Sequence, residues 1–132
     1  MSRENVEVVR RLHEAWNRDD TEAMLELMQR DMEYVNPAYA VEGGTKPGHA
    51  GFSRVMDNLR ESFVVYRHDP EEMIDEGDHV IVRSRFEATG RGSGARIVRS
   101  RVHAWTLRDG KAVRVQWFDT IPEALEAVGL RE

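Results

Sequence analysis

The feature that most constrains the fold is a change of hydrophobic period at Phe63. Before this residue the apolar side chains recur at helical spacing, and after it they alternate with polar ones, as in β-strands. Helices are predicted at Glu4–Arg18, behind Asp19, and from His49 to Phe63. The sequence predicts five strands in the second part: Val64–His68, Glu71–Asp75, His79–Thr89, Ala95–Arg108 and Ala112–Phe118.

Helices that precede a run of strands predict an α+β domain, in which three N-terminal helices cover one face of an antiparallel sheet. The strands predicted at His79–Thr89 and Ala95–Arg108 exceed the usual strand length, so we expect the sheet to curve strongly around the helices. The expected shape is a cone, closed at one end and open at the other. A short helix from Pro122 to Gly129 ends the chain, following the usual preference for proline first and glycine last.

The remaining segments are shorter. Met32–Asn36 predicts a strand that Pro37 ends, and Ala38–Gly48 is expected to be a loop because it is rich in turn residues without a period. Asp109-Gly110 predicts a tight hairpin.

Composition narrows the class of protein. The 132 residues are 40% hydrophobic, which favours one domain over residues 1–132 with one core. The absence of cysteine excludes disulfides and thiolate nucleophiles and fits a cytoplasmic protein. We expect no secretion signal and no membrane span, because no apolar run approaches the required length.

The charge pattern argues against a nucleic-acid partner. The formal net charge is -5, and the one basic cluster is interleaved with acids. We interpret that cluster as a solvated strand face, and it comprises Arg91, Arg96, Arg99 and Arg101. No spacing of histidines or carboxylates resembles a metal site, so we predict neither a metal nor another cofactor.

The last predicted strand ends in a carboxylate. In "AVRVQWFDT", from Ala112 to Thr120, Val115 and Trp117 share one face and Asp119 continues it. Apolar walls would desolvate this carboxylate, which is the setting of a general base. The alternative is an exposed aspartate that caps the last helix.

Other candidate site residues come in pairs on strands. Tyr34 and Asn36 share a face, where a hydroxyl and an amide can orient a water or a substrate oxygen; ordinary strand packing and turn chemistry are the alternative. Arg85 and Glu87 fall on the polar side of their strand, which favours a solvent-exposed ion pair unless a bulge shifts the register. His103 is a candidate acid or a core histidine.

Large aromatic residues are expected to divide between the core and the wall of a pocket. The sequence alone does not separate the two groups. The candidates are Trp16, Phe52, Phe63, Trp105 and Trp117.

Three stretches carry a family resemblance. They are "VRRLHEAWNRDD", "DMEYVNPAYAVEGGTKPGHAGF" and "VHAWTLRDGKAVRVQWFDTIPEALEAVGL". Together they resemble the nuclear transport factor 2-like superfamily, in particular its SnoaL-like, polyketide-cyclase-type branch. The resemblance implies the cone-shaped fold, but this fold hosts isomerases, cyclases, dehydratases, epoxide hydrolases and binding proteins, so it does not select an activity.

Individual positions resemble particular branches. Ketosteroid isomerases have a catalytic Asp where this chain has Asn36, and a Tyr where it has Leu12, which argues against that chemistry. SnoaL-type cyclases imply roles for Asp119 and His103.

Limonene epoxide hydrolase is similar in its spacing of polar residues. The similarity implies a site made of Tyr34, Asn36, Arg85, Glu87 and Asp119, with Glu87 a departure because that family has Asp there.

We therefore expect a small-molecule pocket protein that binds a small apolar or polyketide-like compound. The favoured function is an acid/base enzyme of the cyclase, isomerase or epoxide-hydrolase type, which uses Asp119. The alternative is a non-catalytic ligand-binding or dimeric scaffold domain. We also expect a homodimer formed through the outer face of the sheet, where arginines and acids alternate.

Overall fold

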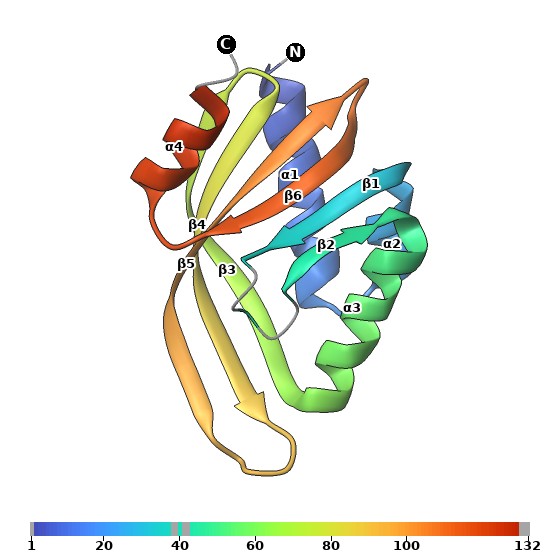
Figure 1. The fold of residues 1–132 in the computed structure, drawn as a ribbon, viewed down its shortest axis with the longest axis vertical. Coiled ribbons are helices and arrows are strands. Elements are labelled where there is room, and N and C mark those ends of the chain that lie inside the picture. The colour runs from blue at the N-terminus through green and yellow to red at the C-terminus, as the bar shows by residue number, and fades with distance from the viewer. Residues whose placement is uncertain (1, 38–39, 41–42, 130–132) are drawn as a thin grey trace.

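A computed structural model describes residues 2–37, 40 and 43–129. Three helices, α1 (Ser2–Asn17), α2 (Thr21–Glu26) and α3 (Gly48–Ser62), precede most of a six-stranded sheet, and α4 (Ile121–Gly129) follows it (Figure 1). The strands are β1 (Met28–Asn36), β2 (Gly44–Pro47), β3 (Phe63–Glu76), β4 (His79–Gly90), β5 (Arg96–Arg108) and β6 (Lys111–Phe118). The expected α+β architecture with a curved sheet is confirmed.

The helices divide between the two faces of the sheet, and this division defines an inner and an outer face. The apolar stripe of α1, with Val9, Leu12 and Trp16, is buried against the inner face together with Trp105 of β5. On the outer face, α4 covers a smaller cluster through Ala124 and Val128, which pack on Ile81, Val102 and Ala104. Alternation along each strand supplies both clusters, because successive side chains point to opposite faces.

The strand order is β2-β1-β6-β5-β4-β3. β1 runs parallel to β6, whereas the other pairs among the described strands are antiparallel. The hairpin predicted at Asp109-Gly110 is present, and both residues have the positive φ (53° and 75°) that a tight two-residue turn requires.

Two segments differ from the sequence-based expectation. The two strands predicted at Val64–His68 and Glu71–Asp75 form the single strand β3, with a register shift between Pro70 and Glu72. An edge strand tolerates proline because its outer side needs no ladder hydrogen bonds. Within the expected loop Ala38–Gly48, residues 44–47 form the edge strand β2, while positions 38–39 and 41–42 lie outside the described residues.

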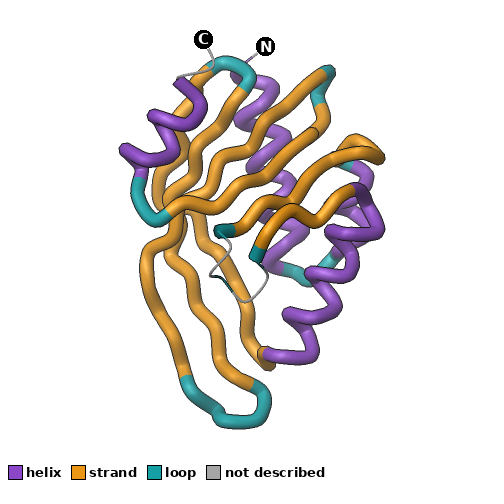
Figure 2. Tube along the Cα trace, viewed as in Figure 1, coloured by secondary structure: helices purple, strands orange, loops and turns teal. Residues whose placement is uncertain are grey.

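The strands differ in length in a way that opens one end of the sheet. The last residue of β6, Phe118, pairs with Val102 of β5, and residues 96–101 of β5 continue beyond it beside β4 (Figure 2). This segment of β5 therefore has a neighbouring strand, β4, on one side only. Among the described helices, none is both long and apolar enough to span a membrane.

Candidate functional site

A cavity of about 520 Å³ lies where β5 outruns β6. It is lined by Tyr34 and Asn36 of β1, by Phe86 of β4, by Arg101 of β5 and by Asp119, which follows β6. Leu59 of α3 and two residues of β3, Phe63 and Tyr66, complete its helical side. Its volume is in the range of small-molecule sites.

Tyr34 and Asn36 lie together on the inner face, as their spacing predicted. The Nδ2 of Asn36 is 3.5 Å from the hydroxyl oxygen of Tyr34, and both residues are buried. The Oδ1 of Asn36 is buried without a hydrogen-bond partner among the described residues. Such an acceptor is costly to bury unless a ligand or water group donates to it.

Asp119 lines the same cavity, but its side chain is exposed, so the expected desolvation is wrong. β6 ends at Phe118, and Asp119 stands beyond the apolar wall of the strand rather than inside it. A hydrogen bond that caps α4 is made by the next residue, Thr120. The Oγ1 of Thr120 accepts from the backbone N–H of Glu123 at 3.3 Å, which is an N-cap hydrogen bond, and it donates to the Glu123 carboxylate at 3.0 Å.

Arg85 and Glu87 are on the outer face, away from the cavity. Their side chains pair at 3.1 Å, and Arg96 reaches the other oxygen of Glu87 at 3.0 Å. Between them Phe86 points to the inner face. The set implied by limonene epoxide hydrolase is therefore split between the two faces, as expected for a strand without a bulge at this point.

His103 is fully buried below the cavity, in a cluster with His13 and His68. The Nε2 atoms of His13 and His103 are 2.8 Å apart, and His68 stacks on Phe86 with ring centroids 4.9 Å apart. Burial lowers the pKa of His13 to about 4 and the pKa values of His68 and His103 well below the usual range; the nearby charge of Arg101 lowers the last two further. The cluster is neutral at pH 7.

Arg101 lies between this cluster and the cavity, and the sequence analysis missed it. Its guanidinium carbon is 4.6 Å from the ring centroid of Trp117 and 5.7 Å from that of Phe86. Strand alternation could have identified it, because Arg101 has the same side-chain direction as His103 and Trp105 on the inner face. Grouping it with neighbouring arginines by composition hid this difference.

The aromatic candidates divide between the core and the cavity walls. Phe63 lines the cavity of about 520 Å³, whereas Phe52, Trp105 and Trp117 are buried in the core, with Trp117 beneath Arg101. Trp16 is buried as well and lines a second, smaller cavity.

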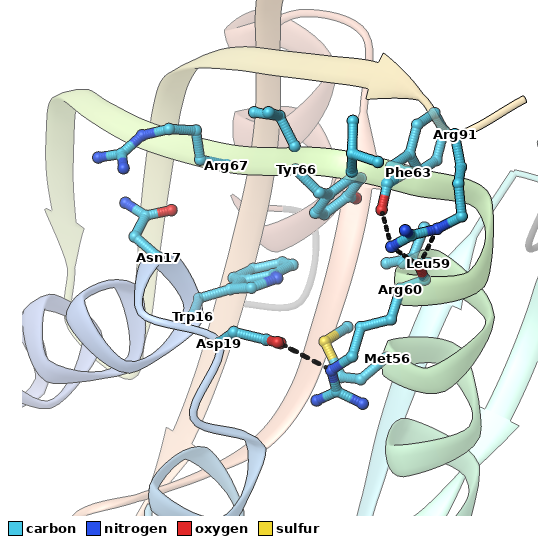
Figure 3. A pocket seen from close by; sticks show the side chains of 12 residues that line it. Trp16, Asn17, Asp19, Met56, Leu59, Arg60, Phe63, Tyr66, Arg67 and Arg91 are labelled. Atoms are coloured by element: carbon cyan, nitrogen blue, oxygen red, sulfur yellow. Dashed lines mark hydrogen bonds and ion pairs between the residues drawn. The ribbon is translucent and has the colours of Figure 1, made fainter. Parts of the chain in front are cut away.

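This second cavity, of about 360 Å³, lies between α1, α3 and β3 (Figure 3). An Arg60–Asp19 ion pair (2.8 Å) lies at its edge, and Arg91 donates to the backbone carbonyls of Arg60 and Phe63 at 2.8 and 3.1 Å. Leu59, Phe63 and Tyr66 line both cavities and so form the wall between them. The charged groups here already have partners.

The described part of the chain contains no candidate metal site. No three or more of its histidines and carboxylates are arranged to hold a metal ion. The three buried histidines form an aromatic cluster instead.

Solved structures share this fold. TerC, co-crystallized with polyporic acid, is 30% identical, with a TM-score of 0.80 over 96% of this chain and 98% of TerC. A protein from Burkholderia pseudomallei, described as NTF2-like and of unknown function, is 25% identical, with a TM-score of 0.81 over 93% and 95% of the two chains. A protein from Jannaschia sp. CCS1 described as a SnoaL-like polyketide cyclase is 22% identical, with a TM-score of 0.78 over 96% and 92%.

These likenesses define the fold as NTF2-like. The SnoaL-like domain model matches residues 9–115, and the chain belongs to that family. No curated protein matches it significantly.

Proposed function

We propose that the protein is a cofactor-independent acid/base enzyme of the cyclase type, which acts on a small polyketide-like compound. The observation that carries the proposal is the convergence of Tyr34, Asn36 and Asp119 on one cavity, although they come from opposite ends of the sequence. The parallel pairing of β1 with β6 brings them together, since it aligns Tyr34 with Val115.

The proposed step starts with Asp119 as the base. Its carboxylate removes a proton from a carbon next to a substrate carbonyl, and the C–H electrons form an enolate. The enolate carbon attacks a second carbonyl of the same molecule, so one C–C bond forms and a C=O bond becomes an alkoxide. The alkoxide takes the proton back from Asp119, which restores the carboxylate and leaves the atom count unchanged.

Tyr34 and Asn36 have the orienting role. The Tyr34 hydroxyl and the Asn36 amide offer donors at one side of the cavity, and the unpartnered Oδ1 of Asn36 offers an acceptor. Because both residues are fixed on β1, they hold substrate oxygens without loop movement.

The relatives favour cyclase chemistry over epoxide opening. TerC was co-crystallized with a small organic molecule, which supports a small-molecule ligand here. Epoxide hydrolysis through the Arg85–Glu87 pair has no support from the geometry, because that pair faces away from the cavity.

The test is turnover of a panel of polyketide-like substrates and epoxides by the wild type and by Asp119→Asn. We expect the variant to lose about 10²–10⁴-fold in rate with an unchanged melting temperature. The control is Asp31→Asn, an exposed aspartate on β1, which should keep full activity. Wild-type rates in Asp119→Asn would refute the assignment of the base.

A binding protein without turnover is the second candidate, and the exposure of Asp119 favours it. An exposed carboxylate stays in contact with water, whereas proton abstraction from carbon is favoured by a site that excludes water. This function predicts ligand binding with no turnover in either protein.

We also propose that the protein forms a homodimer through the outer face of the sheet. Exposed Val98 lies on this face beside the alternating charges of Arg85, Glu87 and Arg96, which can pair with a second copy across a two-fold axis. Light scattering at micromolar protein should give twice the 15.2 kDa chain mass, and a monomer mass would contradict the proposal.

A further inference from the structure

The inner-face arginines of β5 differ from the outer-face arginines Arg67, Arg83, Arg85 and Arg96, which all pair with a carboxylate. Along β5, alternation places Arg99 opposite Phe86 and Arg101 opposite Ser84, so both belong to the inner face. Both line the larger cavity. In the described part of the chain, neither makes an ion pair.

The contact that Arg101 does make fixes its position without using its donors. Its guanidinium lies against the Trp117 and Phe86 rings, at 4.6 and 5.7 Å from their centroids. A guanidinium held over an aromatic face keeps N–H groups at its edge, and these can bind a planar anionic group at two points.

Among the described residues, no ion pair compensates the positive charge of Arg101. Below it lie His68 and His103, which are neutral and fully buried, and the indole of Trp117. A charge beside such apolar and neutral groups is costly unless an opposite charge approaches it. The histidines supply none.

The charged lining of the cavity is positive, although the whole chain is negative. Two arginines and one carboxylate line it among the described residues, a balance of +1, whereas the chain carries -5. The carboxylate, Asp119, is exposed and follows the end of β6. Arg101 is half-buried and lies over the Trp117 and Phe86 rings. Arg101 is therefore the least exposed of the charged residues that line the cavity.

We infer that Arg101, assisted by Arg99 at the exposed end, is the specificity-determining group for an acidic oxygen on an aromatic or ring-containing ligand. The ligand class is a small aromatic acid, whose charged oxygen binds the guanidinium edge while its ring lies among Phe63, Tyr66 and Phe86. The inference deepens the proposed function by naming the charge of its substrate, and it rests on the same cavity.

The test compares a matched pair of probes, 2-naphthoate and its neutral methyl ester, by calorimetric titration. We expect the wild type to bind the acid at least about tenfold more tightly than the ester, because charge-assisted hydrogen bonds act on the acid alone. Arg101→Gln should weaken binding of the acid by about ten- to hundredfold and leave the ester unchanged. Arg101→Lys should restore part of the preference.

Two further variants keep the result interpretable. Arg83→Gln removes an outer-face arginine that pairs with Glu71 and Glu72, and should change neither affinity. Arg99→Gln removes an exposed arginine of the cavity lining. It should weaken binding of the acid less than Arg101→Gln does, and it leaves the contacts of Arg101 with Trp117 and Phe86 in place. It therefore tests the charge preference even if Arg101→Gln does not fold.

Three results would overturn the inference: no binding of the acid by the wild type, equal affinity for acid and ester, or a preference that persists in Arg101→Gln. Its failure is separable from that of the proposed function. A charge preference with full turnover in Asp119→Asn would remove only the catalytic proposal. Loss of turnover in Asp119→Asn without a charge preference would remove only the present inference.

Discussion

The outer and inner faces of the sheet use the same residue type in different ways. On the outer face Arg67 pairs with Asp69 at 2.7 Å, and Arg85 and Arg96 both pair with Glu87. On the inner face Arg101 rests on an aromatic ring instead. Arg96 and Arg101 belong to the same strand, but one has an even and the other an odd position, so they face opposite sides of the sheet. Arg96 therefore binds a neighbouring acid, whereas Arg101 is available to a ligand.

The two faces also differ in how they contribute to stability. The side chains of the outer pairs are partly exposed, and solvent screening makes the contribution of such pairs to stability small. The inner face instead stacks histidine and indole rings in the buried core. The buried aromatic rings are thus on the face that also carries the cavity, whereas the outer face has ion pairs and the smaller apolar cluster under α4.

The largest expected effect follows from removing an aromatic ring of the inner face. Phe86 is 5% exposed and contacts His68, Tyr66 and Arg101. We expect Phe86→Ala to lower the free energy of unfolding by about 3–5 kcal/mol, measured by urea denaturation.

The matched change on the outer face is Val98→Ala, since Val98 is 42% exposed. Its effect on the unfolding of the single chain should stay within about 0.5 kcal/mol. Similar losses in the two variants would show that the faces do not differ as described.

The response to acid sharpens the comparison. In the unfolded chain each buried histidine binds a proton as the pH falls through 6.5, whereas in the folded protein its pKa is lower. The unfolded state therefore gains more protons, and stability falls as the pH decreases from 7 towards 5, with a slope that rises below pH 6.5 towards a limit of about 1.4 kcal/mol per pH unit for each such histidine. The outer-face carboxylates respond at lower pH. Arginine partners lower the pKa values of Asp69 and Glu87, so the contribution of these two carboxylates to stability is lost only below about pH 4.5.

His68→Phe isolates one histidine of this response. Both ring nitrogens of His68 lack hydrogen-bond partners among the described residues, so phenylalanine removes a titrating group without breaking a hydrogen bond. The slope of unfolding free energy between pH 6 and 5 should decrease, by up to the one-proton limit of about 1.4 kcal/mol per pH unit. Equal slopes in both proteins would contradict a neutral buried histidine at this position.

The smallest expected effect is that of Glu87→Gln. The change removes the acid shared by Arg85 and Arg96 on the outer face, and we expect a small loss of stability with unchanged turnover, because solvent screens such pairs. Thermal unfolding and a rate assay measure both quantities. A large loss of rate would place Glu87 in the chemistry, as its similarity to limonene epoxide hydrolase implies.

Local patterns predicted the fold because each acts over a few residues. The stripe of α1, the hairpin at Asp109-Gly110 and the break at Phe63 are set by periodicity and turn chemistry. The parallel pairing of β1 with β6 joins segments far apart in the sequence, and no local signal specifies which strands pair or in which direction. The short edge strand β2 likewise depends on β1 for its hydrogen bonds.

The candidate site was predictable in part. Tyr34 and Asn36 reached the inner face through simple alternation, and Arg85 and Glu87 took the polar side by the same rule. The exposure of Asp119 depends on where β6 stops, and strand ends are poorly determined by pattern. Whether these side chains act in catalysis stays a prediction.

The hydrogen bond between His13 and His103 makes a pair of identical side chains chemically unequal. Both rings are neutral at pH 7, and their Nε2 atoms are 2.8 Å apart, so one Nε2 carries the shared proton and the other offers its lone pair. The accepting ring must then hold its own proton on Nδ1. The folded core thus selects two different tautomers from chains in which either ring samples both, and nitrogen NMR of labelled protein should resolve one imidazole of each kind.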